Sequence, residues 1–283
     1  MATKKSSLFK KVTNIILSFI LAFLIFVLSL MLVLQIVFFN QTSMMDALSN
    51  SGYLTETNKE ITQSLTDLGY ASGLDESFFD GLLTDSLLYT DTAKYISDFY
   101  SGEGSVVDTT DFKELFNTAL DDYISEKQLD PTAVNAESRE YLVNSAAKIY
   151  KDSLELPLFK TIAGYFLGIK NALPKVMIVD ITLIALICII IVVSSKWKHR
   201  AAKYICYSTT TAFLATLTPA IALLASGKIK QLNIASQATY KLFVTLGNEL
   251  VLTLIYFSVF FAIISIALYM LYRYLYPKNS SNI

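Results

Sequence analysis

One acidic side chain falls inside an apolar stretch of the sequence. Asp180 follows Pro174 by six residues and directly precedes 181–193, a run without any charged residue, in which Thr182 lies. Because a charge is costly in hydrocarbon, an ionisable residue in such a run is a candidate for handling protons or ions. The same carboxyl could instead make a structural contact, as a helix cap or as a bond to a neighbouring helix. Both interpretations of Asp180 are open on sequence alone.

A second polar group lies in the apolar stretch 204–226, which carries Thr216 and Thr218 among several alanines and continues into Pro219. Small and hydroxylated residues let membrane helices pack closely, and a proline inside a helix can kink it. We therefore expect this stretch in the middle of a helix bundle, with Pro219 as a candidate kink. The candidate intramembrane polar site comprises Asp180, Thr182, Thr216 and Thr218.

The residues on which most enzymes depend are scarce. His199 is the single histidine, and the two cysteines, Cys188 and Cys206, both fall in apolar stretches. This argues against histidine-based triads and the common histidine-containing zinc sites. No Walker A, EF-hand, nucleophile-elbow or dinucleotide-binding pattern occurs either. The sequence predicts a protein that is not an enzyme, with no catalytic residue, metal or cofactor, and with no nucleic acid as partner.

Long apolar stretches must position these residues. Four of them, 12–39, 176–195, 204–226 and 250–272, reach the roughly 20 residues that a helix needs to cross the hydrocarbon core of a bilayer. The 283-residue chain is 17% charged, with a mean hydropathy of +0.48, whereas soluble domains carry about 25% charged residues. The first stretch exceeds the apolar core of a signal peptide and is therefore predicted to be an uncleaved signal anchor.

Lysine and arginine concentrate in three short segments, 1–11, 196–203 and 273–283. In a four-span chain these segments lie on one side of the bilayer, and positive charge in short loops marks the cytoplasmic side. We therefore expect a multi-pass plasma-membrane protein with both termini in the cytoplasm and with 40–172 and the loop 227–249 outside. The expected anchors at the lipid headgroups are Lys10, Lys11, Trp197, Arg200 and Arg273.

The segment 40–172 has helical patterning. Apolar residues recur at helical spacing over 112–124 and over 136–154, and Pro157 is expected to end the second helix. Strand-like alternation is weak, so the sequence predicts an all-α, four-transmembrane-helix protein with an extracytoplasmic helical domain inserted between helices 1 and 2. Shorter helices are expected at 54–68, 76–89 and 91–100.

Two further segments have alternative placements. The stretch 158–170 is apolar with lysines at its edges, and its spacing predicts a helix. That helix lies either on the membrane surface, before Pro174 turns the chain inward, or in the core of the outer domain. The loop 227–249 has the same two alternatives, against the membrane or packed under the domain.

The formal net charge of −1 conceals two opposite regions. Residues 40–172 contain 22 acidic and 9 basic residues, whereas the rest contains 14 basic and 2 acidic ones. An acidic body attracts cations and basic partners with a strength that falls as salt rises. The sequence thus predicts a non-enzymatic accessory or scaffold protein whose outer domain binds a membrane or cell-envelope protein or a cationic envelope partner, or forms a homo-oligomer. The alternative is a transmembrane subunit of a transport or ABC-type export system with a separate ATPase.

The order of one span, a large outer domain and three further spans resembles, in topology only, the MacB/FtsX-class ABC permeases. That resemblance implies an ATPase partner. Those permeases usually place an amphipathic helix before the first span, where this chain has about eleven residues. The segment Ser51-Gly-Tyr-Leu-Thr-Glu-Thr-Asn-Lys-Glu60, just beyond a basic signal anchor, is also similar to uncharacterised four-span membrane proteins of low-GC Gram-positive bacteria, a resemblance that implies no activity.

Overall fold

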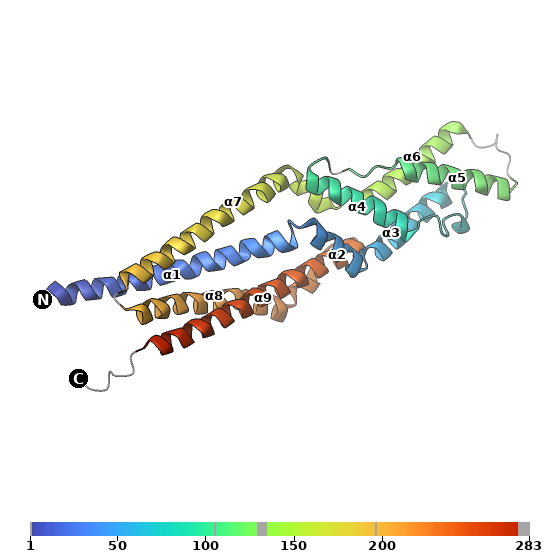
Figure 1. Ribbon diagram of the computed structural model, residues 1–283. Coiled ribbons are helices and arrows are strands. Elements are labelled where there is room, and N and C mark those ends of the chain that lie inside the picture. Colours follow the sequence, from blue (N-terminus) through green and yellow to red (C-terminus); the bar gives the residue numbers. More distant parts are fainter. Residues whose placement is uncertain (1, 105, 129–134, 196, 277–283) are drawn as a thin grey trace. The chain divides into compact units, whose positions relative to one another are not determined.

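A computed structural model describes residues 2–104, 106–128, 135–195 and 197–276. Within these ranges every regular element is a helix (Figure 1), which confirms the all-α prediction. The chain divides into two compact units. We call the first, formed by 1–40, 169–231 and 247–283, the apolar unit, and the second, formed by 41–168 and 232–246, the acidic unit.

The apolar unit contains α1 (Ala2–Val37), most of α7 (Pro157–Ser194), α8 (Lys198–Ser226), the short 3₁₀-helix η3 (Lys228–Gln231) and most of α9 (Gln237–Leu275). Its four long helices are long and apolar enough to cross a membrane. The chain is therefore a helical protein with four candidate transmembrane helices, at the positions where the sequence predicted four spans.

The helices that carry the second and fourth predicted spans are longer than expected. Helix α7 continues through Pro174, so this proline does not turn the chain as expected. Neighbouring groups in membrane helices can re-satisfy the backbone carbonyl that a proline leaves free. Pro157 begins α7 instead of merely ending the helix before it, because its fixed φ and missing N–H suit the first helical position. Helix α9 begins at Gln237, inside the segment expected to be a loop.

The acidic unit contains α2 (Gln41–Ser51), α3 (Tyr53–Ala71), the 3₁₀-helix η1 (Glu76–Phe78), α4 (Asp85–Ser101), α5 (Thr110–Glu126) and α6 (Ala136–Leu154), followed by the first turns of α7 and α9. Large aromatic side chains fill its core. The rings of Phe112 and Tyr150 stack with centroids 4.3 Å apart, and those of Phe99 and Phe159 with centroids 4.0 Å apart. Burial of such rings stabilises a unit whose surface is charged.

Parts of the segments 158–170 and 227–249, namely 158–168 and 232–246, pack within the acidic unit. Phe159 and Phe166 of α7 are buried against the aromatic side chains of α4, so this part of α7 contributes to the core of the acidic unit, as one of the two alternatives predicted. At the start of α9, the Lys241 Nζ atom lies 2.8 Å from Glu56 Oε1, and the backbone N–H of Ala238 donates to Glu60 Oε1 at 3.1 Å. Residues 232–246 therefore pack on α3.

Helix boundaries in the acidic unit were predicted unevenly. The expectation for 136–154 is confirmed by α6. The two helices expected at 76–89 and 91–100 are wrong, because a single helix, α4, begins at Asp85. The Thr84 side chain accepts a hydrogen bond from the Leu87 N–H at 3.2 Å and so caps the start of α4. Gly81, at φ +73°, reverses the chain before it.

Candidate functional site

The predicted intramembrane site divides between two sides of its helices. Asp180 on α7 is 5% exposed, and Thr216 on α8 is fully buried. Thr182 and Thr218 are exposed, and each hydroxyl donates to a carbonyl of its own helix, to Ile178 at 2.8 Å and Leu214 at 2.7 Å. The structure therefore retains Asp180 and Thr216 as inward-facing residues and places Thr182 and Thr218 outside the site. Helix α8 continues through Pro219, and the kink there stays a prediction.

Asp180 belongs to the packed side of α7. Within the apolar unit, the buried residues of α7 include Leu173, Asp180 and Ile187, which are spaced seven residues apart. Ile191, one turn beyond Ile187, is also buried. Seven residues make about two turns, so these side chains lie above one another on one side of the helix. The carboxyl therefore points toward neighbouring helices.

The other three long helices also contain fully buried hydroxyl residues, among them Ser29 on α1, Thr216 on α8 and Ser258 on α9. Every one of these hydroxyls donates to a carbonyl of its own helix. The bonds run from Ser29 to Phe26 at 2.6 Å, from Thr216 to Ala212 at 3.0 Å, and from Ser258 to Ile255 at 2.7 Å. Sequence reasoning missed Ser29 and Ser258, whose only signal is a lone serine in an apolar run.

Contacts between α1 and α7 show which residue of α1 lies level with Asp180 along the helix axes. The Ser194 hydroxyl of α7 donates to Asn14 Oδ1 of α1 at 2.6 Å, and further along the two helices Ile25 and Ile184 pack on one apolar cluster. From the first of these contacts to the second, residue numbers rise on α1 and fall on α7, so the two helices run antiparallel. One more turn from Ile25 reaches Ser29, and one more turn back from Ile184 reaches Asp180.

The same reasoning places the hydroxyls of α8 and α9. The hydroxyls of Thr209 and Ser265 are 2.8 Å apart. Seven residues onward from Thr209 is Thr216, and seven residues back from Ser265 is Ser258, so these two residues share a height in the antiparallel pair α8 and α9.

Helix α8 is tied in turn to α1. The Ser18 hydroxyl of α1 donates to the Tyr204 carbonyl of α8 at 2.8 Å, and Ser29 and Thr216 lie eleven and twelve residues onward. We call the four buried residues at this height, Ser29, Asp180, Thr216 and Ser258, the polar layer.

The expected headgroup anchors lie near the start of α1, the start of α8 and the end of α9, away from the polar layer. Lys10, Lys11, Trp197, Arg200 and Arg273 are all exposed. Trp197 and Arg200 line a shallow pocket of about 420 Å³ together with Lys203, His199, Tyr272 and Tyr276. Aromatic and basic side chains gathered at one end of a membrane helix bundle are typical of the lipid headgroup region.

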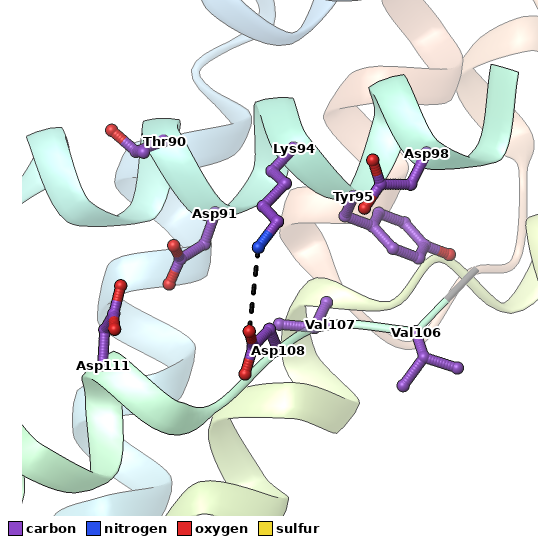
Figure 2. Close-up of a pocket in the computed structure, with 9 residues that line it drawn as sticks. All are labelled: Thr90, Asp91, Lys94, Tyr95, Asp98, Val106, Val107, Asp108 and Asp111. Carbon is purple, nitrogen blue, oxygen red and sulfur yellow. Dashed lines mark ion pairs between the residues drawn. The ribbon is translucent and has the colours of Figure 1, made fainter. Parts of the chain in front are cut away.

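The acidic unit has its own cluster of charged residues. A small pocket of about 90 Å³ lies between α4 and the segment leading into α5. Figure 2 shows the carboxyl groups of Asp91 and Asp111, which line it, pointing toward each other. The basic side chain of Lys94 also lines the pocket, and its Nζ atom lies 3.7 Å from Asp108 Oδ2. The Tyr150 hydroxyl donates to Asp91 at 2.6 Å, and burial raises the pKa of the Asp91 carboxyl.

This pocket does not have the arrangement of a metal centre. Among the described residues, no group of three or more histidine, cysteine or carboxylate side chains is placed to hold a metal ion. A second carboxylate, Glu155, is almost fully buried, and it accepts from the Val107 N–H at 3.0 Å and pairs with Lys160 at 2.6 Å. Glu155 thereby ties the segment before α5 to the start of α7, which is a structural task.

No protein-family model, no curated protein and no solved structure matches the chain. The topological resemblances to ABC permeases and to four-span proteins of Gram-positive bacteria therefore stay predictions. The fold alone defines the class: a helical protein whose four apolar helices are long enough to cross a membrane.

Proposed function

We propose that the chain is a four-pass plasma-membrane protein with both termini in the cytoplasm and the acidic unit on the outer side. Support comes from the basic segments 1–11, 196–203 and 273–283, which alternate along the chain as three short cytoplasmic segments would. The acidic unit connects to the other ends of the same helices, through the segment after α1 and the first turns of α7 and α9.

We further propose that the acidic unit binds a partner with a basic surface, in an accessory role without catalysis. The observation that carries this proposal is the excess of acid: residues 40–172 hold 22 acidic and 9 basic residues. A surplus of one sign raises the local concentration and the association rate of oppositely charged partners.

Internal ion pairs leave this excess in place. Among the described residues, these ion pairs engage seven basic side chains of the acidic unit: Lys59, Lys94, Lys127, Arg139, Lys151, Lys160 and Lys241. These seven cations meet only five carboxylates, because Glu56 and Glu155 each take two. The ion pairs of the described residues therefore do not cancel the acidic excess of this unit.

Purification of the full chain from its native membranes in mild detergent tests this proposal. At low salt we expect a stoichiometric basic partner, which dissociates when salt is raised because the attraction is screened. The double variant Asp80→Lys with Asp122→Lys changes two exposed carboxylates and should lose the partner. Its matched control, Asp80→Glu with Asp122→Glu, keeps both charges and should retain the partner. A chain that purifies without any partner, or equal recovery with both double variants, would contradict the proposal.

The structure gives less support to a transport subunit driven by a separate ATPase. Helix α7 ends at Ser194 and α8 begins at Lys198, so only residues 195–197 connect them. A connection of three residues has no room for a cytoplasmic coupling helix. Partner binding by the acidic unit is therefore the better supported function.

A further inference from the structure

The polar layer contains an ionisable group, one oxygen of which has no hydrogen-bond partner among the described residues. This oxygen is the buried Oδ2 atom of Asp180. A carboxylate that is buried without donors or a counter-charge is strongly unfavourable, in protein and in lipid alike. A neutral carboxyl has a much smaller cost, so the surroundings of Asp180 decide which form it takes.

The hydroxyls of the layer cannot act as donors to a carboxylate. A serine or threonine hydroxyl has one proton, and Ser29, Thr216 and Ser258 each direct theirs to a carbonyl of their own helix. Their oxygens are left with lone pairs only. An ionised Asp180 would therefore receive no hydrogen bond from these hydroxyls, whereas a protonated Asp180 has no charge that needs one.

Charged groups that could neutralise Asp180 are also distant from the layer. The described stretches 22–36 of α1 and 209–223 of α8 contain no titratable residue. On α9, residues 251–265 contain only Tyr256, whose side chain is 69% exposed. Lys175 on α7 is exposed and lies five residues away from Asp180.

The position of the layer along the helices places it within hydrocarbon. Asp180 is fourteen residues from Ser194, which corresponds to about 21 Å along α7. A bilayer core is about 30 Å thick. If the anchors around Trp197 mark one headgroup region, Asp180 lies roughly two thirds of the way across.

We propose that the polar layer is a proton-binding site, in which Asp180 is held as a neutral carboxyl because no described residue donates to its buried Oδ2 atom. Release of the proton to water would leave an unpaired anion, so it requires water to enter the layer or α7 to separate from its neighbours. The inference rests on the membrane assignment made above. It does not depend on the partner of the acidic unit.

Infrared spectroscopy of the full chain in lipid nanodiscs at neutral pH tests this site. The carbonyl stretch of a protonated carboxyl is separate from the bands of ionised carboxylates. We expect one such band in the wild type, shifted in D₂O, and its loss in Asp180→Asn. Asparagine is a neutral isostere, so this variant should fold. The matched control is Thr182→Val, which removes an exposed hydroxyl two residues away and should keep the band.

Three outcomes would overturn the proposal. The first is a wild-type spectrum without the band at neutral pH. The second is a band that persists in Asp180→Asn. The third is a band that disappears when sodium replaces choline in the buffer, because the layer would then hold a metal cation in place of the proton.

A second measurement covers the case in which Asp180→Asn does not fold. Wild-type protein with ¹³C-labelled aspartate carboxyls should show the band at the shifted position of an aspartic acid, and an unshifted band would exclude Asp180. Neither measurement depends on a partner or on the side at which the acidic unit lies, so failure here is distinct from failure of the partner proposal.

Discussion

The two units of this chain are packed in opposite ways. In the acidic unit the buried side chains include large aromatics such as Tyr53, Tyr95 and Phe116, and the surface carries the charge. In the apolar unit many buried positions are alanine, serine or threonine, while large apolar side chains face outward, among them Phe19 at 72% exposed and Val193 at 80%. The acidic unit thus has the packing expected in water, and the apolar unit has the packing expected of helices in lipid.

The contrast has a simple physical origin. In water, burial of apolar surface stabilises a fold by about 25 cal/mol per Å², so the largest apolar groups go inside. In lipid, an apolar side chain gains little from burial, and helices associate through close packing and hydrogen bonds between small residues. The same substitution should therefore have different effects in the two units.

The largest difference should come from truncation of a phenylalanine. Phe112 is fully buried and stacked on Tyr150. Phe112→Ala should lower the free energy of unfolding of the acidic unit by about 3–5 kcal/mol, because it removes apolar contacts and leaves a cavity. Phe19→Ala, at an outward position of α1, is the matched control and should leave stability nearly unchanged. Denaturant titration followed by limited proteolysis would measure both, and equal losses would contradict the contrast.

Enlarging a small buried side chain should destabilise the apolar unit, where helices pack through small residues. Ala212 is fully buried in α8, where α1 packs closely against the helix. Ala212→Leu should lower stability by about 1–3 kcal/mol, because it forces the packed helices apart. Leu214→Phe enlarges an exposed residue of the same helix and should have little effect. Thermal unfolding in detergent measures both variants, and a harmless Ala212→Leu would show that α1 and α8 are not closely packed.

A hydrogen bond between α1 and α8 should have a smaller effect. The hydroxyls of Ser18 and Ser208 lie 2.9 Å apart in the interior of the apolar unit. A double-mutant cycle with Ser18→Ala and Ser208→Ala should give a coupling of about 0.6 kcal/mol, the average for such bonds in membrane proteins. A coupling near zero would mean that packing alone holds α1 and α8 together.

The smallest effect should be a pH dependence at the surface of the acidic unit. Arg139 donates to Asp121 at 2.7 Å, and this hydrogen bond holds the pKa of the Asp121 carboxyl below its usual value. The contribution of Asp121 to stability is therefore full above the pKa of the unfolded chain, about 4, and is lost as the pH falls through the lowered value. When unfolding midpoints are measured at a series of pH values, Asp121→Asn should reduce the fall in stability at acid pH. The matched control Asp122→Asn, at the neighbouring residue, should leave this acid-dependent fall in stability unchanged.

The sequence predicted the elements better than their connections. Asp180 was identified because a charge in an apolar run is conspicuous, and α6 because its apolar period is long and regular. Ser29 and Ser258 were missed because a serine can bond to its own helix, so its type does not reveal which side it occupies. Pro174 was misjudged because neighbouring helices, which the sequence does not reveal, decide whether a proline interrupts a membrane helix.

The packing of 232–246 on α3 also lay beyond the sequence. It depends on contacts such as that between Lys241 and Glu56, which are far apart along the chain. The apolar pattern of this segment was compatible with a membrane surface and with a protein core alike.

Labelling of single cysteines in intact cells tests most directly that one unit faces water outside and the other crosses the bilayer. In a chain with Cys188→Ala and Cys206→Ala, a cysteine is introduced at exposed Tyr141 of the acidic unit or at exposed Tyr274 near the end of α9. A membrane-impermeant maleimide should label Tyr141→Cys in intact cells and Tyr274→Cys only after permeabilisation. Labelling of Tyr274→Cys in intact cells, or protection of Tyr141→Cys, would contradict the account.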